Sequence, residues 1–275
     1  MLIGLVRRVA AAVLAAALCG WLSTLAPADG GLRLAAAQSE AAAAKGAAPS
    51  NSAAPEPAPA PEPPPDCRQV KCLALTFDDG PAESTGELLD ILAERDVKAT
   101  FFLIGENVAE NPEVVRRQHQ AGHEIADHSY THADLGRASK KTIVAELTRT
   151  QDAIRSASGV TPTLLRPPYG STSKRLAKVS RRMGMAQILW TVDPFDWRHR
   201  DTEDIERRVV KSAEPGGIVL LHDIHPTTVR AVPEIIDRLA AKGYVFVTVS
   251  ELFGGKLAPG EEYRELESGE GQGLP

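Results

Sequence analysis

The chain has 275 residues, of which 43% are hydrophobic and 24% charged, and its formal net charge is −5. A chain of this length and composition can build one large globular core or two small ones, and its acidic net charge gives no basic footprint for nucleic-acid binding. We therefore expect no nucleic-acid partner. Glutamates concentrate after Lys256, and we interpret residues 256–275 as an acidic flexible tail.

The N-terminal residues have the composition of an export signal. Arg7 and Arg8 precede an apolar, alanine-rich run over residues 9–18, and small-residue cleavage patterns follow at 26–28 and 35–37. This order predicts a secretory signal peptide over 1–37. An uncleaved signal anchor is the alternative, because the apolar stretch approaches the ~20 residues that span a bilayer. The protein is therefore expected to be secreted or periplasmic, or tethered to the inner membrane.

Residues 38–66 are rich in alanine, proline, glutamate and serine and contain no aromatic residue. Such a segment cannot bury a core, so we interpret it as a linker. Cys67 and Cys72 follow it directly, whereas Cys19 would leave with the signal peptide. An even pair of cysteines in an exported protein predicts a disulfide, with two reduced thiols as the alternative.

Residues 67–255 alternate short apolar runs with helical patterns and form the expected folded domain. Strands are predicted at 71–77, 100–104, 124–127, 164–166, 187–192, 218–221 and 244–249. Helices are predicted at 83–95, between 105 and 122, and at 139–156, 174–183, 202–211 and 226–242. About seven strands separated by helices indicate a parallel sheet covered by helices. Because most strands end in an ionisable cluster, as barrel strands do at active sites, an irregular β/α barrel fits better than an open sheet.

The first two ionisable clusters contain carboxylates and histidines. Asp78 and Asp79 end the first strand, and such adjacent carboxylates are accommodated when one binds a metal and the other acts as a base. The alternative is an ordinary acidic turn. His128 and His132 follow the third strand at i, i+4, and together with a carboxylate they suit zinc or a similar divalent ion, although this spacing also arises by chance. Asp127 excludes the HExxH protease pattern.

Three further clusters follow later strands, at 166–170, 193–197 and 220–223. Two prolines in the first present Arg166 from a rigid, extended turn. Taken singly, each cluster also has an ordinary structural interpretation. The first fits a Pro-Gly loop, the second a capped turn with an exposed aromatic residue, and the third a histidine in the core. Their joint order at strand ends is more specific than any one of them. His199 and His225 lack this context and are interpreted as surface residues.

In this order the five clusters resemble the motifs of the NodB-homology polysaccharide deacetylases, carbohydrate esterase family 4. The matching segments are TFDDG at 76–80, HSYTH at 128–132, RPPYG at 166–170, DPFDW at 193–197 and LLH at 220–222. The resemblance spans residues 71–222, with the strand pattern continuing to about 253, and includes neither the leader nor the tail. It implies a distorted (β/α) barrel of about seven strands, NodB-homology type.

The resemblance also implies a metal site and an acid–base pair. Asp79, His128 and His132 would hold a divalent metal, zinc by default, with cobalt or nickel as alternatives. Asp78 would be the general base that activates water, and His222 the general acid that protonates the leaving amine.

Further roles implied by the resemblance concern residues around this pair. Arg166 would hold Asp78, and Asp193, in preference to Asp196, would orient His222. The backbone N–H of Tyr169 would help to hold the oxyanion, while Trp197 and Leu220 would line a pocket for the acetyl methyl group.

The expected function is therefore metal-dependent removal of N-acetyl groups, with O-acetyl groups as an alternative, from a cell-wall or extracellular polysaccharide such as peptidoglycan or a chitin-like glycan. The partner is the acetylated glycan, and the protein is expected to act as a monomer. Two alternatives are an inactive carbohydrate-binding member of the same fold and an amidase acting on small C–N substrates. The first predicts loss of Asp78 or His222 and the second loss of a metal histidine, and all of these residues are present.

Overall fold

The computed structural model describes residues 64–266, all of which belong to one compact unit, Ala60–Pro275. The predicted signal peptide at 1–37 and the linker up to residue 63 lie outside the described residues, as do residues 267–275. Among residues 64–266, none of the helices combines the length and apolarity that a bilayer span requires.

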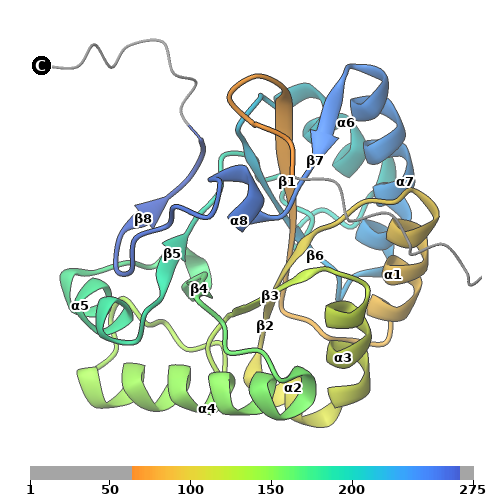
Figure 1. Cartoon of the computed structure of the whole chain (residues 1–275). Coiled ribbons are helices and arrows are strands. Elements are labelled where there is room, and N and C mark those ends of the chain that lie inside the picture. The colour runs from red at the N-terminus through yellow and green to blue at the C-terminus, as the bar shows by residue number, and fades with distance from the viewer. Residues whose placement is uncertain (1–63, 267–275) are drawn as a thin grey trace, which may run out of the picture. The chain divides into compact units, whose positions relative to one another are not determined.

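Within residues 64–266, eight strands join in one sheet, and every strand pair in it is parallel (Figure 1). The order is β6-β1-β2-β3-β4-β5-β8, and β7 pairs with the start of β1. Single bridges join Val192 to Val219 and Gly217 to Glu265, so the curled sheet closes irregularly beside β6. This confirms the predicted distorted barrel. The strands are β1 (Lys71–Asp78), β2 (Thr100–Leu103), β3 (Glu124–Asp127), β4 (Leu164–Leu165), β5 (Ala186–Ile188), β6 (Ile218–His222), β7 (Tyr244–Phe246) and β8 (Glu262–Tyr263).

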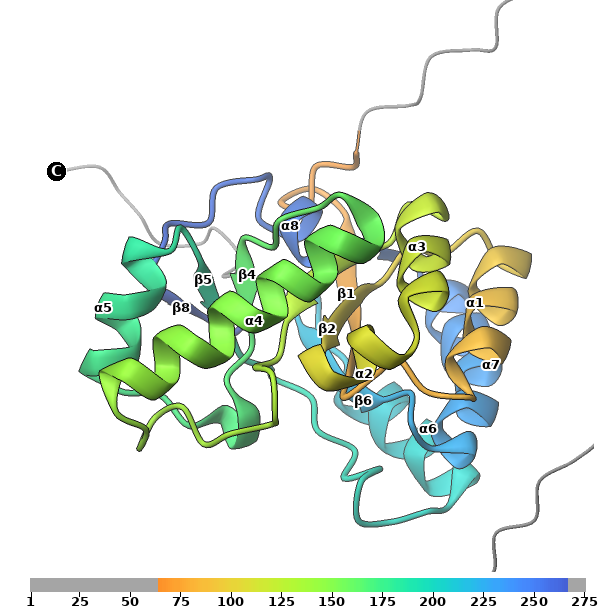
Figure 2. The same ribbon diagram turned by 90° about the horizontal axis from the view of Figure 1, so that it is seen from below.

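Helices α1 to α7 form a layer outside the sheet (Figures 1 and 2), whereas the buried residues of α8 pack in the cluster inside the barrel. Neighbouring helices contact one another in the order α6, α7, α1, α3, α4 and α5, and α2 packs beside α4. The helices are α1 (Thr85–Glu94), α2 (Gly105–Glu110), α3 (Pro112–Gln120), α4 (Lys140–Ser158), α5 (Lys174–Arg182), α6 (Thr202–Ser212), α7 (Pro226–Ala241) and α8 (Val249–Leu252), with a 3-10 turn, η1, at Pro168–Gly170.

Strand β1 separates two layers of core. Leu73, Leu75 and Phe77 pack outward against the helices, whereas Cys72 and Ala74 belong to the cluster inside the barrel. Because side chains of a strand alternate between its faces, Thr76 and Asp78 continue the inward row. Asp78 thereby stands at the end of the strand and inside the barrel.

Two predicted elements are divided in the structure. The helical segment between 105 and 122 contains α2 and α3, and α3 begins at Pro112, where a proline fits the first turn of a new helix. The predicted strand at 244–249 ends at Phe246. Thr248 and Glu251 then form a capping box that starts α8, which is a helix signal in the sequence itself.

The prediction of a flexible tail from residue 256, and with it the domain boundary at 255, is wrong for residues 256–266. Strand β8 pairs with β5, and Tyr263 stacks edge-to-face on Phe253 with 5.1 Å between ring centroids. Arg181 on α5 forms a 2.6 Å ion pair with Glu261. This segment therefore completes the sheet, although its glutamates suggest a solvated tail.

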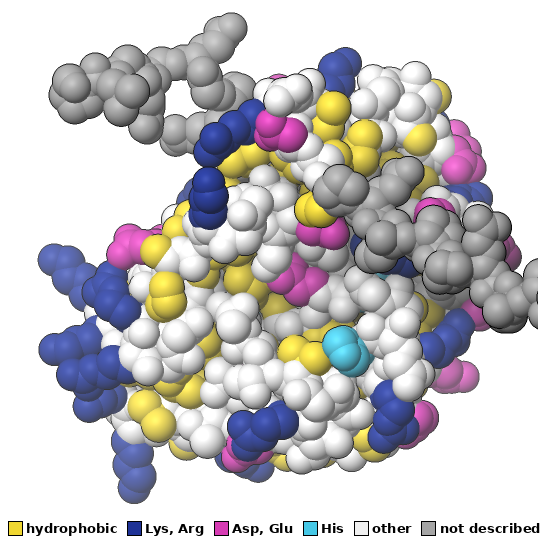
Figure 3. Space-filling model, in the orientation of Figure 1, with side chains coloured by type: hydrophobic (Ala, Val, Ile, Leu, Met, Phe, Trp, Pro, Cys, Tyr) yellow, Lys and Arg dark blue, Asp and Glu magenta, His cyan; other side chains and the backbone are white. Residues whose placement is uncertain are grey.

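Basic side chains gather on one edge of the domain despite the acidic net charge (Figure 3). In Figure 1 this edge holds α5, whose sequence KRLAKVSRR supplies five cations over nine residues. None of these residues lines the cleft described below.

Candidate active site

The carboxyl ends of the strands open into a cleft of about 470 Å³. It gathers side chains from every motif and is lined by Asp78, Asp79, His128, His132, Pro167, Tyr169, Trp190, Asp193, Trp197, Leu220 and His222. Parallel strands bring these residues together because their carboxyl ends meet at one rim. Arg166 lies beneath the cleft and is fully buried.

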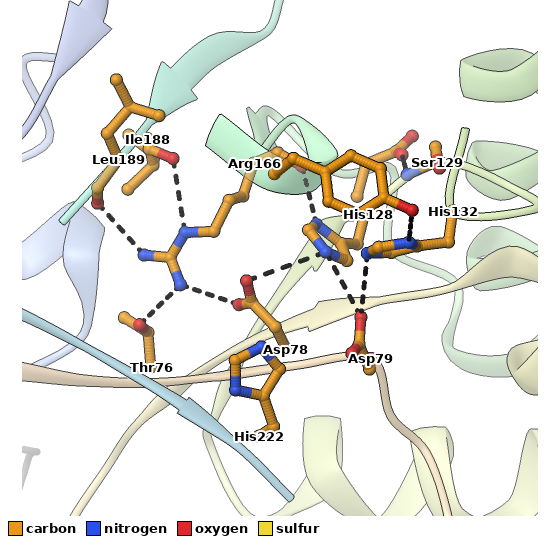
Figure 4. A network of polar contacts seen from close by, with 12 residues as sticks. Thr76, Asp78, Asp79, His128, Ser129, His132, Arg166, Ile188, Leu189 and His222 are labelled. Carbon is orange, nitrogen blue, oxygen red and sulfur yellow. Dashed lines mark hydrogen bonds and ion pairs between the residues drawn. The ribbon is translucent and has the colours of Figure 1, made fainter. Parts of the chain in front are cut away.

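Asp79, His128 and His132 form a group able to hold a metal ion, since one ligand atom from each lies within 4.8 Å of the others. The Nε2 atoms of both histidines are 3.4 Å from Oδ1 of Asp79 (Figure 4). That oxygen is buried and has no hydrogen-bond partner. A buried oxygen without a partner, facing two imidazole nitrogens, fits a divalent cation with open positions.

The outer contacts of the two histidines orient them toward Asp79. Nδ1 of His128 lies 2.7 Å from the carbonyl oxygen of Arg166, which can only accept, so Nδ1 carries the proton and Nε2 presents its lone pair. Nδ1 of His132 lies 3.1 Å from the hydroxyl of Tyr169. Burial, and then the neighbouring His128, lower the pKa of His132, which favours the neutral form that a metal requires.

The carboxyl group of Asp79 is held in its ionised form. Burial would raise the pKa of Asp79, but its contacts with the neighbouring histidines, first of all His128, outweigh this effect and lower the pKa to about 2. On the backbone side, Asn107 of α2 donates its side-chain N–H to the carbonyl of Asp79 at 2.7 Å. The carboxylate is thus fixed in place and available as an anionic ligand.

Glu146 of α4 holds the segment between the two histidines. Its Oε2 accepts the backbone N–H groups of Tyr130 and Thr131 at 2.9 and 2.8 Å, and the Thr131 hydroxyl donates to the same carboxylate. Ser129 and His132, on either side of this pair, have positive φ angles of 64° and 57°. The buried carboxylate therefore anchors a strained loop that carries both imidazoles.

Sequence reasoning missed Glu146, although a signal was present. Ile143, Leu147 and Ile154 mark the buried stripe of α4, and Glu146 lies in that stripe. A carboxylate on the apolar side of a helix needs a partner, which its spacing alone would have indicated.

Arg166 fixes Asp78 by a direct ion pair (Figure 4). Its Nη1 donates to Oδ1 of Asp78 and to the hydroxyl of Thr76, both at 2.7 Å. The rest of the guanidinium donates to the carbonyls of Ile188 and Leu189 at 3.3 and 3.2 Å. These carbonyls turn inward, which explains why β5 ends at Ile188 and not at residue 192 as predicted.

His222 is oriented by Asp196, so the prediction that Asp193 does this is wrong. Oδ1 of Asp196 lies 2.8 Å from Nδ1 of His222, and Thr228 supports the other oxygen at 2.9 Å. Oδ1 of Asp193 instead accepts the backbone N–H of Phe195 at 2.7 Å. The turn at 193–197 points the two carboxylates differently, and Asp193 keeps a place in the cleft wall.

The surroundings of His222 favour its charged form. Burial alone would lower the pKa of His222, but the hydrogen bond and charge of Asp196, with the charges of Asp78 and Asp79, raise it to about 9. His222 is therefore protonated at neutral pH and can donate a proton into the cleft.

The predicted substrate-contacting residues surround this chemistry. Tyr169 is 70% exposed at the cleft, Trp197 is 46% exposed, and Leu220 is buried in the wall. Cys67 and Cys72 are joined in a disulfide outside the cleft. Of the two histidines interpreted as surface residues, His199 is exposed, whereas His225 is half-buried with its ring centroid 6.1 Å from that of His222.

Comparison with known proteins agrees with this geometry. The family model for polysaccharide deacetylases matches residues 66–188. A peptidoglycan-N-acetylglucosamine deacetylase of Listeria monocytogenes is 40% identical over 200 residues, which is 72% of this chain but 42% of the relative. The chain thus spans under half the length of that relative.

Two further proteins are matched over most of their length. A chitooligosaccharide deacetylase of Bradyrhizobium sp. is 37% identical over 195 residues, covering 65% of this chain and 89% of the relative. The solved structure described as T48 deacetylase with substrate has a TM-score of 0.70 and 41% identity, covering 72% of this chain and 98% of the other. The motifs, the distorted barrel and these matches together place the chain in the polysaccharide deacetylase family.

Proposed function

We propose that this protein is a metal-dependent deacetylase that removes N-acetyl groups from a glycan of the cell wall or extracellular space. One observation carries the proposal. A single cleft holds a set of metal-binding residues, a buried carboxylate beside it, and a protonated histidine. Amide hydrolysis needs these three elements: charge stabilisation, a base for water and an acid for the leaving nitrogen.

Asp79, His128 and His132 would hold the metal. Two imidazoles and one carboxylate suit zinc, with cobalt or nickel as alternatives. When bound, such an ion lowers the pKa of water and polarises the carbonyl of the acetyl group.

Asp78 would act as the general base. Its Oδ2 lies 3.7 Å from Nε2 of His128, beside the metal-binding group, while its Oδ1 is held by Arg166. The fixed guanidinium keeps the carboxylate in one orientation, with one oxygen left to take a proton from the attacking water. Removing its negative charge would leave metal binding in place and abolish this proton transfer.

His222 would act as the general acid. An amine leaves readily only when its nitrogen is protonated, and a histidine with a pKa of about 9 carries that proton at neutral pH. Asp196 positions the ring through Nδ1, so Nε2 remains free to donate.

The remaining contacts concern the acetyl group. We assign the backbone N–H of Tyr169 to the developing oxyanion, and Trp197 and Leu220 to the methyl group. All three residues line the cleft, and Tyr169 is held in an unusual backbone conformation with φ 63°. Such strain is typical of functional positions.

The substrate class is proposed from the relatives and from the leader. The relatives described above carry names that refer to N-acetylglucosamine in peptidoglycan and to chitooligosaccharides. A signal peptide or anchor at 1–37 followed by the 38–66 linker would place the domain in the periplasm or outside the cell, where such polymers occur. We therefore propose an N-acetylglucosamine polymer as substrate, acted on by a monomeric domain.

The test is acetate release by the metal-loaded protein from chitin oligomers, peptidoglycan and acetylxylan, with a chelator control. We expect chelator-sensitive release from an N-acetylglucosamine polymer. Asp78→Asn should keep its metal content but lose turnover, and His128→Ala should lose the metal. A metal-loaded protein that releases no acetate from any of the three polymers would favour the inactive, carbohydrate-binding alternative.

A further inference from the structure

Phe195 is an exposed aromatic residue beside the cleft that the proposed chemistry does not use. Its side chain is 40% exposed, and it is not among the residues that line the cleft. Its ring lies edge-to-face with Trp197, with 6.2 Å between centroids and 62° between planes. Because Trp197 does line the cleft, Phe195 lies next to a residue of the cleft wall.

The backbone of Phe195 is strained, with φ of 58°. In residues 64–266, six residues other than glycine have positive φ, and Asp96 alone of these lies away from the motifs. Four of the others are Asp79, Ser129, His132 and Tyr169, which belong to the proposed metal-binding and substrate-contacting segments. Phe195 is the remaining one, and strained backbone of this kind clusters at functional sites.

The turn explains the backbone conformation but not the side chain. The N–H of Phe195 donates to Asp193, and its carbonyl accepts the N–H groups of Arg198 and His199 at 3.0 and 2.7 Å. Glycine or asparagine would adopt this left-handed conformation with less strain than phenylalanine. The ring packs against Trp197, but 40% of the Phe195 surface stays exposed, so packing within the domain accounts for only part of the side chain. The exposed part of the ring is available to contact a ligand.

We propose that Phe195, together with the outer face of Trp197, forms a stacking subsite for a second sugar of the glycan chain. This rests on the proposed function, in which the acetylated sugar occupies the cleft. The face of a pyranose ring presents C–H groups, which are attracted to the negative face of an aromatic ring. A linear glycan would thus continue from the cleft across the Trp197–Phe195 surface.

The rim of this surface favours a sugar over a lipid or an apolar peptide. Arg198, His199 and Arg200 are all exposed beside the aromatic pair. The guanidinium of Arg200 donates to the backbone carbonyl of Trp197 at 2.8 Å, which ties one cation to the backbone of this segment. Hydrogen-bond donors around an apolar platform match the hydroxyl groups around the apolar face of a sugar.

The experiment measures binding of N-acetylglucosamine oligomers of one to five residues by calorimetry, in an Asp78→Asn background so that acetyl groups persist. In this background the oligomers should bind more tightly as they lengthen. Phe195→Asn removes the ring and tolerates the left-handed backbone, so the variant should fold with an unchanged or higher melting temperature. We expect it to reduce the affinity gain from monomer to pentamer by about fivefold, the scale of one aromatic stacking contact.

Two further variants serve as controls. Phe195→Tyr retains the ring and should keep the affinity gain within about twofold. Val144→Ala removes an apolar side chain of α4 that is 39% exposed, and should leave the gain unchanged. A folded Phe195→Asn variant with the full affinity gain would refute the subsite. The subsite would also be refuted if the Asp78→Asn protein with Phe195 intact bound monomer and pentamer equally.

The acetate assay is run separately on metal-loaded protein with Asp78 intact. Acetate release combined with a full affinity gain in Phe195→Asn would leave the deacetylase proposal standing and remove the subsite. Absence of acetate release combined with a reduced gain in Phe195→Asn would remove the deacetylase proposal and leave a glycan-binding surface.

Discussion

Asp196 holds His222 at two points: Oδ1 lies 2.8 Å from Nδ1 of the ring, and Oδ2 accepts the backbone N–H of His222 at 2.7 Å. Asp196 is itself fully buried, and Thr228 satisfies it further. One carboxylate therefore fixes both the position and the charge of the proposed acid. Asp193, which is nearby in sequence, makes no such contact with His222.

Replacing Asp196 by asparagine should lower kcat by about 100-fold, the usual contribution of a positioned acid. The pKa of His222, now about 9, should fall toward its ordinary value, since the charge of Asp196 is lost. The alkaline limb of the pH–rate profile should move to lower pH accordingly. Asp193→Asn is the matched control and should leave that limb in place; the reverse pattern would restore the assignment made from sequence.

The stability of the metal-free protein should decrease between pH 7 and 9. The pKa of His222 is raised from 6.5 to about 9, so the folded state binds this proton more tightly than the unfolded state. The resulting stabilisation is complete below pH 6.5 and disappears as pH rises through the folded pKa. Urea unfolding at a series of pH values measures it.

A second buried group makes the choice of pH range important. Burial raises the pKa of Asp223 from 3.8 to about 7, so this carboxyl group lowers the free energy of unfolding as pH rises between those values. Above pH 7 its contribution is constant. The decrease between pH 7 and 9 should therefore persist in Asp223→Asn and vanish in His222→Gln, and its persistence in the latter would exclude His222 as the cause.

Glu146→Ala should weaken zinc binding by about 10- to 100-fold, the range found when an outer partner of a metal site is removed. Without the carboxylate, two backbone N–H groups between His128 and His132 lose their acceptor, and the strained loop can relax. Competition with a chromophoric chelator measures the affinity. Asp152→Ala, an exposed acid of the same helix paired with Arg155, should bind zinc normally. Equal zinc affinity in both variants would show that Glu146 does not position the histidines.

Arg166→Met should destabilise the protein by about 3–5 kcal/mol, because Asp78 would remain as a buried charge without a partner. Adding Asp78→Leu should restore much of the loss, since the charge is then removed. Chemical denaturation of the single and double variants measures this coupling. If the double variant is less stable than Arg166→Met alone, the carbonyl contacts of the guanidinium and not the ion pair dominate.

A chain ending at residue 255 should melt at least ~5 °C below a chain ending at 266, corresponding to about 2 kcal/mol for a domain of this size. The shorter chain lacks β8, the Tyr263 ring against Phe253, and the Glu261 partner of Arg181. Differential scanning calorimetry of the two chains provides the comparison. Equal melting temperatures would indicate that residues 256–266 only rest on the domain.

The sequence by itself determined the class of fold and most of the cleft. Apolar runs of strand length ending in ionisable residues predicted a parallel barrel, since parallel strands bring their carboxyl ends to one rim. That rule, together with the resemblance of the five clusters to the deacetylase motifs, assigned Asp78, Asp79, His128, His132 and His222 to one predicted site. It succeeds because the period of a strand and the direction of the chain are local properties.

The tertiary structure decided which side chains face one another. Asp193 and Asp196 lie in one short turn, and the left-handed Phe195 between them determines which carboxylate reaches His222. Glu146 reaches the histidine loop from another element, across sixteen residues of sequence from Tyr130. Such contacts depend on how a helix packs on a sheet, and local sequence patterns do not specify that packing.

The end of the domain shows the same division. Strand β8 has two residues, too few to show a period of two, and glutamates surround it. Its place in the sheet depends on the free edge of β5 and on the ring of Phe253. Neither of these adjoins β8 in the sequence. The sequence thus determines which chemical groups stand at the ends of the strands. Which of these groups contact one another depends on how the barrel packs.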